Sequence, residues 1–130
     1  ELVNLAKDAG ANCAKFQMRD LSSLYANKGN SSDATQDLGS QYTIDLLSRF
    51  QLNDNELFEV FDHCYDIGIT PLCTPWDIES VNKLEEYGME AYKVASADLT
   101  NHELLGCLAK TGKPIIPSNK YKLTLASPIL

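Results

Sequence analysis

The sequence predicts an α/β fold built on a parallel β-sheet. An amphipathic helix, a glycine and a short apolar strand follow one another four times along the 130 residues, an alternation typical of parallel sheets. The expected strands are short, mostly apolar runs, as in sheets covered by helices. Four glycines stand where helix C-caps belong: Gly10, Gly68, Gly88 and Gly112.

The expected strands cover residues 12–18, 69–74, 91–95 and 114–117. The strongest helix signal covers residues 55–67, where apolar side chains recur at helical spacing. Asn53 and Glu56 form a capping-box pattern at its start. Residues 78–87 and 102–110 repeat the helical pattern in shorter form, and Thr100 or Asn101 can cap the second of these helices.

One long segment differs from the repeating pattern. Residues 19–42 are rich in Ser, Asn, Gly and Asp and follow the first strand directly. A loop of this length in a compact domain is usually functional or disordered, and here it leaves the carboxyl edge of the sheet, where ligands bind in such folds. Residues 44–50 resume a helical apolar pattern, and residues 121–130 have a weak strand-like pattern.

Composition limits the classes of partner. The chain is 44% hydrophobic, which suits one soluble domain with a core, and its net charge is −7. An acidic chain without a basic run is not expected to bind nucleic acid or an anionic membrane. No apolar stretch reaches the length of a membrane span. The four cysteines lack C-x-x-C spacing, so we expect reduced core thiols and a cytoplasmic location.

Two lysines interrupt the apolar strands. Lys15 and Lys93 lie near the ends of the first and third expected strands. A lysine that loses hydration there needs an anion, and two at similar positions favour one shared anionic ligand. Gln17 lies on the same strand face as Lys15, and Phe16 on the opposite face, because side chains alternate. The alternative is a lysine that reaches solvent from a strand end.

Other polar residues follow the strands at the same edge. Thr74 ends the second expected strand and can instead be a helix cap or turn residue, and Ser118 directly follows the fourth strand. Ser96 and Asp98 follow the third. Asp98 can act as an acid or base, pair with a lysine, or cap a helix. The set suits a phosphorylated carboxylate better than a nucleotide, because no glycine-rich nucleotide motif is present. Trp76 is expected to pack against a helix.

The motifs together resemble the N-acetylneuraminate (sialic acid) synthase family. They are AGANCAKFQ (9–17), LNDNE (52–56), GITPLCTPWD (68–77), AYKVASAD (91–98) with TN at 100–101, and TGKPIIPS (111–118). Each motif is short, but their order and spacing make the resemblance specific up to about residue 118. We therefore treat residues 1–130 as one partial barrel domain of this type, with 119–130 unmatched.

The resemblance implies a TIM (β/α)8 barrel that condenses phosphoenolpyruvate with an N-acetylated hexose such as N-acetylmannosamine and releases phosphate. It also implies a divalent metal, Mn²⁺ or Mg²⁺, and a homodimer. Asp98 and Lys93 match catalytic positions, Asp98 in handling the attacking water or the intermediate. The positions that match the phosphoenolpyruvate site are Lys15, Gln17, Thr74, Lys93, Ser96 and Ser118.

The chain covers roughly half of the about 250 residues of a full barrel. The metal-binding histidines implied by the resemblance lie outside it, so no metal ligand is assigned here and the fragment alone is expected to be inactive. Two alternatives remain. One is a non-catalytic α/β fragment that self-associates through open sheet edges. The other is a related phosphoenolpyruvate–aldose synthase that makes an octulosonate or heptulosonate phosphate.

Overall fold

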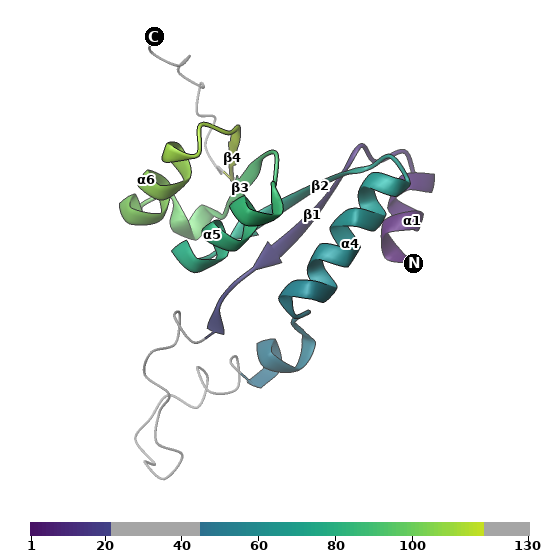
Figure 1. Ribbon diagram of the computed structural model, residues 1–130, viewed down its shortest axis with the longest axis horizontal. Coiled ribbons are helices and arrows are strands. Elements are labelled where there is room, and N and C mark those ends of the chain that lie inside the picture. The colour runs from purple at the N-terminus through teal and green to yellow at the C-terminus, as the bar shows by residue number, and fades with distance from the viewer. Residues whose placement is uncertain (22–44, 119–130) are drawn as a thin grey trace.

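A parallel four-stranded sheet forms the centre of the chain, in the order β1-β2-β3-β4 (Figure 1). The computed structural model describes residues 1–21 and 45–118. The strands are β1 (Cys13–Met18), β2 (Thr70–Pro75), β3 (Tyr92–Val94) and β4 (Ile115–Pro117). All three strand pairings are parallel. Parallel neighbours in sequential order with helical connections form part of a TIM barrel, which confirms the predicted fold class.

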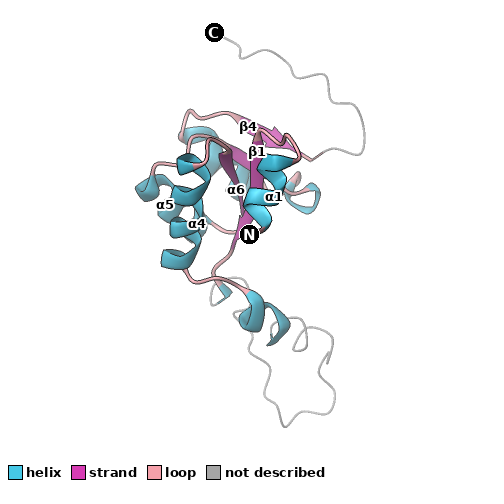
Figure 2. Cartoon of the chain, turned by 90° about the vertical axis from the view of Figure 1, so that its right-hand side faces the viewer, coloured by secondary structure: helices cyan, strands magenta, loops and turns pink. Residues whose placement is uncertain are grey.

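Helix α1 (Leu2–Asp8) precedes β1, and the helices that connect the strands include α4 (Asp54–Asp66), α5 (Ile78–Tyr87) and α6 (His102–Lys110). A short 3₁₀ helix, η1 (Ser96–Asp98), follows β3. Residues 45–50 are also helical, as their apolar pattern predicted. Helices α4 and α5 contact β2, and α5 contacts α6. Figure 2 shows α4 and α5 together on one side of the strands. No helix in the described ranges is long and apolar enough to cross a membrane.

The two faces of the sheet have opposite character. Cys73 of β2 and Tyr92 of β3 are paired and completely buried on the face that the helices cover. On the other face Lys15 and Gln17 are exposed, and Ile116 of β4 keeps 44% of its surface exposed. The predicted opposition of Lys15 and Gln17 to Phe16 is confirmed, because Phe16 packs against the core.

The core lies between the helices and one face of the sheet. Phe61 of α4 is fully buried and makes edge contacts with Phe16 of β1, at 5.3 Å between ring centroids, and with Tyr87 of α5. Tyr87 also stacks on Phe58 at 4.8 Å. This aromatic cluster ties β1 to α4 and α5. The buried apolar residues grouped around it are Met18, Leu57, Phe61, Cys73, Val81, Leu84, Met89, Tyr92, Val94, Leu104 and Leu108.

The predicted helix ends are confirmed at both kinds of terminus. Asn53 and Glu56 form the capping box of α4, with hydrogen bonds of 3.0 and 2.9 Å. Asn101 caps α6 by accepting from the Leu104 N–H. Gly88 ends α5 at φ 91°, a left-handed conformation in which a side chain is unfavourable. The other three predicted glycines also have positive φ.

An ion pair joins segments at the amino edge of the sheet, where the strands begin. Lys113 lies just before β4 and donates to Glu85 of α5 at 2.8 Å, while Tyr92 of β3 donates to the same carboxylate. Burial alone would raise the pKa of Glu85, but the hydrogen bonds from Lys113 and Tyr92 outweigh it, so the pKa is lowered. The contact fixes α5 against two strands.

Several expectations need adjustment or lie outside the described residues. The strands begin one residue later than predicted, β2 ends one residue later, and β3 ends one residue earlier. The four cysteines are free, as predicted, but Cys13 is exposed on the open sheet face, so it is not a core thiol. Most of the long loop predicted at residues 19–42 and the pattern at 121–130 fall outside the described ranges. The single-domain boundary 1–130 stays a prediction.

We predict opposite effects for two glycine-to-alanine substitutions. Gly88→Ala should lower the free energy of unfolding by about 1–2 kcal/mol, because the left-handed backbone penalises a Cβ even though nothing lies within 4 Å of it. Gly106→Ala, inside α6 and equally open, should raise it by about 0.5–1 kcal/mol. Urea unfolding of both variants measures this. Equal destabilisation by both would contradict the assigned backbone conformation of Gly88.

We also predict an acid-dependent contribution from Glu85. Its pKa is lower in the folded chain than the ordinary 4.5, so its stabilisation is present above that value and is lost as the pH falls through the lower, folded pKa. Urea unfolding from pH 7 to pH 3 should therefore show a stability gap between the parent chain and Glu85→Gln that closes in acid. A gap of constant size would show that the charge of Glu85 is irrelevant.

Candidate functional site

The open face of the sheet carries a row of polar side chains. Gln17 pairs with Thr74 across β1 and β2, and Cys73 pairs with Tyr92, so the next residues, Thr74 and Lys93, also align. Gln17, Thr74 and Lys93 therefore lie side by side on three strands, with Gln17 exposed, Lys93 half-buried and Thr74 only 3% exposed. Neighbouring strands are about 4.8 Å apart, so the row is about 10 Å wide.

Lys93 reaches along the sheet towards the carboxyl edge, where the strands end. Its Nζ donates to the carbonyl oxygen of Val94 at 3.0 Å and to the hydroxyl of Ser118. Ser118 follows β4, and its own backbone N–H donates to Val94 at 2.9 Å. Among the described residues, the ammonium group of Lys93 is thus held by neutral oxygens at two neighbouring strand ends.

Lys15 lies on the same face, one row nearer the amino edge. Burial lowers the pKa of Lys93, and the charge of Lys15 lowers it further, so the two ammonium groups are close enough to repel each other. No carboxylate in residues 1–21 or 45–118 forms an ion pair with either lysine. An anion between them would relieve this repulsion. Lys15 and Lys93 therefore share the predicted face of the sheet, but they lie two strands apart, and Lys93 is level with Gln17 rather than with Lys15.

Ser96 and Asp98 lie in η1, directly after β3. Ser96 is exposed. Asp98 receives a hydrogen bond from the Asn101 amide at 3.3 Å on Oδ1, while its Oδ2 is buried and has no partner among the described residues. Asp98 does not cap α6, because the 3₁₀ turn moves that role to Asn101. A buried carboxylate oxygen without a partner is uncommon and suits a group that works on a ligand.

The sequence did not predict that Trp76 and Arg19 hydrogen-bond to Gln17. Trp76, which was expected to pack against a helix, borders a pocket with residues of α5 and α6, and its indole Nε1–H also donates to Gln17 Oε1 at 3.1 Å. Arg19 donates to the same oxygen through Nη2 and lies over the Trp76 ring, with Cζ 4.8 Å from the centroid. The signal available in the sequence was spacing, because Arg19 follows Gln17 by two residues and so continues the same face.

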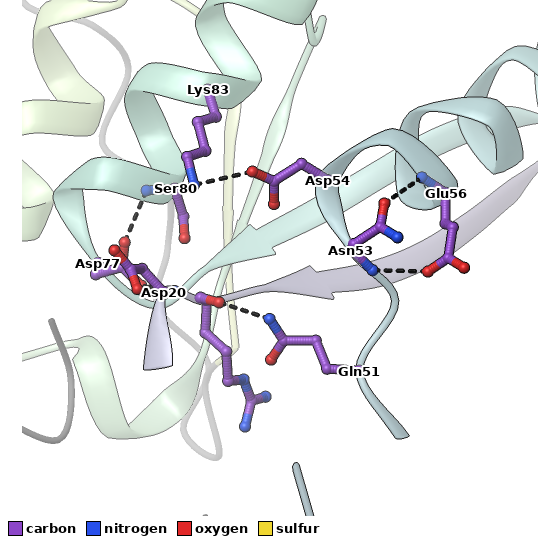
Figure 3. A network of polar contacts seen from close by, with 9 residues as sticks. Asp20, Gln51, Asn53, Asp54, Glu56, Asp77, Ser80 and Lys83 are labelled. Carbon is purple, nitrogen blue, oxygen red and sulfur yellow. Dashed lines mark hydrogen bonds and ion pairs between the residues drawn. The ribbon is translucent and has the colours of Figure 1, made fainter. Parts of the chain in front are cut away.

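The ends of β1 and β2 are tied together by Asp77. One carboxylate oxygen of Asp77 caps α5 by accepting from the Ser80 N–H at 2.7 Å, and the other accepts from the Asp20 N–H at 2.8 Å. Figure 3 shows Asp20, Asp77 and Ser80 gathered at this point. The backbone N–H of Trp76 also donates to Met18 at 3.0 Å. These bonds extend the β1–β2 pairing past the last ladder position.

Two features nearby do not belong to the anion site. A groove at the end of β1 is lined mainly by Phe16, Leu46, Leu47, Phe50, Leu52 and Leu57, and reaches the polar residues at Gln17 and Arg19. Its apolar walls do not suit a charged ligand. Cys73 is buried beneath the sheet, and burial raises the pKa of its thiol to about 12 although the charge of Lys15 opposes this. The Cys73 thiol is therefore not a nucleophile.

The described residues do not fit a metal site. In the part of the chain that the structure describes, no three His, Cys, Asp or Glu side chains group closely enough to hold an ion. The exposed residues His63 and His102 lie on helices away from the strand ends. No chemical step can therefore be assigned to a metal held by these residues.

The fold, a parallel sheet with helices and a polar open face, defines the class of the protein as an α/β barrel chain. The chain belongs to the NeuB family, whose family model matches residues 2–120. The resemblance to the sialic acid synthases that the motifs indicated is thereby confirmed.

Relatives are found in archaea and bacteria. An uncharacterized protein of Methanocaldococcus jannaschii is 36% identical over 118 residues, which are 91% of this chain and 32% of that protein. N,N'-diacetyllegionaminic acid synthase of Campylobacter jejuni is 28% identical over 120 residues, 91% of this chain and 36% of the synthase. The chain thus spans about a third of the length of these relatives.

The human N-acetylneuraminate-9-phosphate synthase is 27% identical over 119 residues, with 91% of this chain and 33% of that enzyme covered. Among solved structures, the N-acetylneuraminic acid synthetase of Leptospira borgpetersenii superposes with a TM-score of 0.75 at 24% identity. The superposed region includes 94% of this chain and 39% of the Leptospira synthetase. At this identity the superposition shows the fold alone.

We predict that Lys15→Met raises the pKa of Lys93, because the repulsion from the Lys15 ammonium disappears while burial remains. At pH 8–9 a smaller fraction of Lys93 would be neutral, so acetylation of Lys93 by acetic anhydride, followed by mass spectrometry, should slow down. Lys7→Met is the matched control, since Lys7 instead donates to the Gly68 carbonyl. An unchanged acetylation rate in Lys15→Met would show that the charge of Lys15 does not lower the pKa of Lys93.

Proposed function

We propose that this chain supplies the phosphoenolpyruvate-binding strands of a sialic-acid-type synthase. The reaction would condense phosphoenolpyruvate with an N-acetylated hexose and release phosphate. Membership of the NeuB family supports the reaction class. One observation carries the ligand assignment, namely that Lys15 and Lys93 lie on the same open face, two strands apart, without a carboxylate partner among the described residues.

Each residue has a distinct part in the proposed site. The lysines would offset the charge of the phosphate and the carboxylate, which phosphoenolpyruvate carries as two substituents of one carbon atom. Gln17 and Thr74 would bind from the same row, and Ser96 and Ser118 would contribute hydroxyls at the carboxyl edge. Ser118 already holds Lys93, so its part is to orient that ammonium group as well as to meet the ligand.

Asp98 is proposed as the group that handles the attacking water or the reaction intermediate. Its buried and unpartnered Oδ2 supports this part, because such an oxygen can accept a proton or a hydrogen bond from a ligand. A divalent metal, Mn²⁺ or Mg²⁺, belongs to the proposal for the family reaction only. When bound, it would polarise the sugar aldehyde, and its ligands are not among the described residues.

Phosphoenolpyruvate binding tests the proposed site directly. Calorimetric titration of the 130-residue chain should show binding that Lys93→Met or Lys15→Met weakens by about 10- to 100-fold, the worth of a hydrogen bond to a charged group. Lys110→Met is the matched control, because Lys110 is an exposed lysine at the end of α6. Equal losses in all three variants would indicate general charge attraction rather than a site.

Turnover separates the proposed reactions. Phosphate release from phosphoenolpyruvate should be undetectable with the chain alone, and rapid release with N-acetylmannosamine and Mn²⁺ would contradict the expectation that the metal ligands lie outside it. If release occurs, a panel of unphosphorylated N-acetylated hexoses and phosphorylated aldoses distinguishes a sialic-acid-type synthase from a phosphoenolpyruvate–aldose synthase, since the latter takes phosphorylated sugars.

Self-association is the second candidate function. β1 and β4 are the outer strands of the described sheet, and each has one edge without a neighbouring strand there. Free backbone donors and acceptors on such edges invite pairing with another chain. Ile116 of β4 is also 44% exposed. Light scattering over a range of concentrations tests this candidate and the expected homodimer, and a monomer at the highest concentration would exclude both for this chain.

A further inference from the structure

Gln17 differs from the other polar residues of the open face because its amide oxygen is already occupied. Gln17 Oε1 receives hydrogen bonds from the Trp76 indole, at 3.1 Å, and from the Arg19 guanidinium. Both groups are donors only, since neither indole N–H nor guanidinium can accept a hydrogen bond. The atom at which they meet must therefore be the oxygen, and the orientation of the amide is fixed by chemistry rather than by choice.

Because the Gln17 oxygen is occupied, the NH2 group of the amide is the part left to contact a ligand. Gln17 Nε2 has no partner among the described residues, although Gln17 is exposed on the face that carries Lys15 and Lys93. An amide turned the other way would place an NH2 group against two donors and lose both hydrogen bonds. Gln17 is thus restricted to presenting N–H groups, which recognise acceptor oxygens such as those of a phosphate or carboxylate.

The two donors are themselves held in place. Arg19 lies over the Trp76 ring, and the Gln51 amide donates to the Arg19 carbonyl at 2.7 Å. The backbone N–H of Trp76 is bonded to Met18, so the indole extends from a backbone already tied to β1. A group whose supports are fixed before the ligand arrives loses less conformational freedom on binding.

We propose that Trp76 and Arg19 are positioning residues, which hold the Gln17 amide with its NH2 group directed to an anionic ligand. Gln17 then selects ligands that offer acceptor oxygens and disfavours those that offer donors. This inference takes the identity of the ligand, phosphoenolpyruvate, from the proposed function. The contact between Trp76 and Gln17 does not depend on that identity and can be tested without any ligand.

The ligand-free test uses the fact that Trp76 is the only tryptophan of the chain. A ¹⁵N-labelled sample has one indole N–H resonance. Gln17→Leu should move this resonance upfield and speed its exchange with solvent, because the acceptor is gone. Gln17→Glu is the matched control, since its carboxylate still accepts from Trp76 and should keep the N–H protected. An indole resonance that is unchanged in Gln17→Leu, with backbone resonances showing a folded chain, would overturn the proposal.

The ligand test is a double-mutant cycle with phosphoenolpyruvate, measured by calorimetry. Trp76→Phe keeps the ring under Arg19 but removes the N–H, and should weaken binding by about 3- to 10-fold, the worth of one neutral hydrogen bond. In a Gln17→Leu background the same substitution should have no further effect. Gln17→Glu, which replaces the free NH2 with an oxygen, should weaken binding more than Trp76→Phe.

The outcomes separate the two proposals. If Trp76→Phe weakens binding equally in both backgrounds, Trp76 does not act through Gln17, and the positioning role is wrong while the ligand site stands. If the parent chain does not bind phosphoenolpyruvate at all, the proposed function fails, and the indole resonance alone decides whether Trp76 and Arg19 fix the amide.

Discussion

The parallel register between β1 and β2 is the constraint on which the rest of the structure depends. Six residues of β1 pair in step with six of β2, from Cys13 with Thr70 to Met18 with Pro75. Because strand side chains alternate, a slip of one residue would move Lys15 into the apolar core and Phe16 out of it. Such a slip would bury an unpaired charge, which costs several kcal/mol. The apolar packing against α4 and the polar row on the open face therefore enforce the same alignment.

Charged side chains are paired at the amino edge of the sheet, whereas two lysines towards the carboxyl edge lack an ion-pair partner among the described residues. At the amino edge, Glu85 receives hydrogen bonds from Lys113 and Tyr92, so charges there are paired and the segments are fixed to one another. On the open face and towards the carboxyl edge, Lys15 and Lys93 have no carboxylate partner in the described ranges, and Asp98 keeps a buried oxygen unsatisfied. Charged groups without an ion-pair partner among the described residues are thus concentrated at the edge where barrel folds have their active sites.

Much of the fold could be predicted, because its signals are local. Helical spacing, the Asn53 capping box and the glycines located the helices and strands to within a residue or two. Strand alternation likewise placed Lys15 and Gln17 on one face. The interactions of Trp76 and Arg19 were missed because they depend on how β1 and β2 come together, which no single segment specifies. Cys13 was assigned to the core because it lies in a predicted strand. The alternation of side chains instead places Cys13 with Lys15 on the exposed face.

The two oxygens of Asp77 have a mechanical consequence. One caps α5 and the other holds the Asp20 backbone, so the start of the helix and the segment leaving β1 cannot shift independently. Arg19 and Trp76 are the immediate neighbours of these anchored residues in the chain. A displacement of α5 would therefore move Trp76 through the backbone and the segment of Arg19 and Asp20 through the Asp77 carboxylate. Because Trp76 and Arg19 both hold Gln17, the position of α5 is coupled to the open face of the sheet.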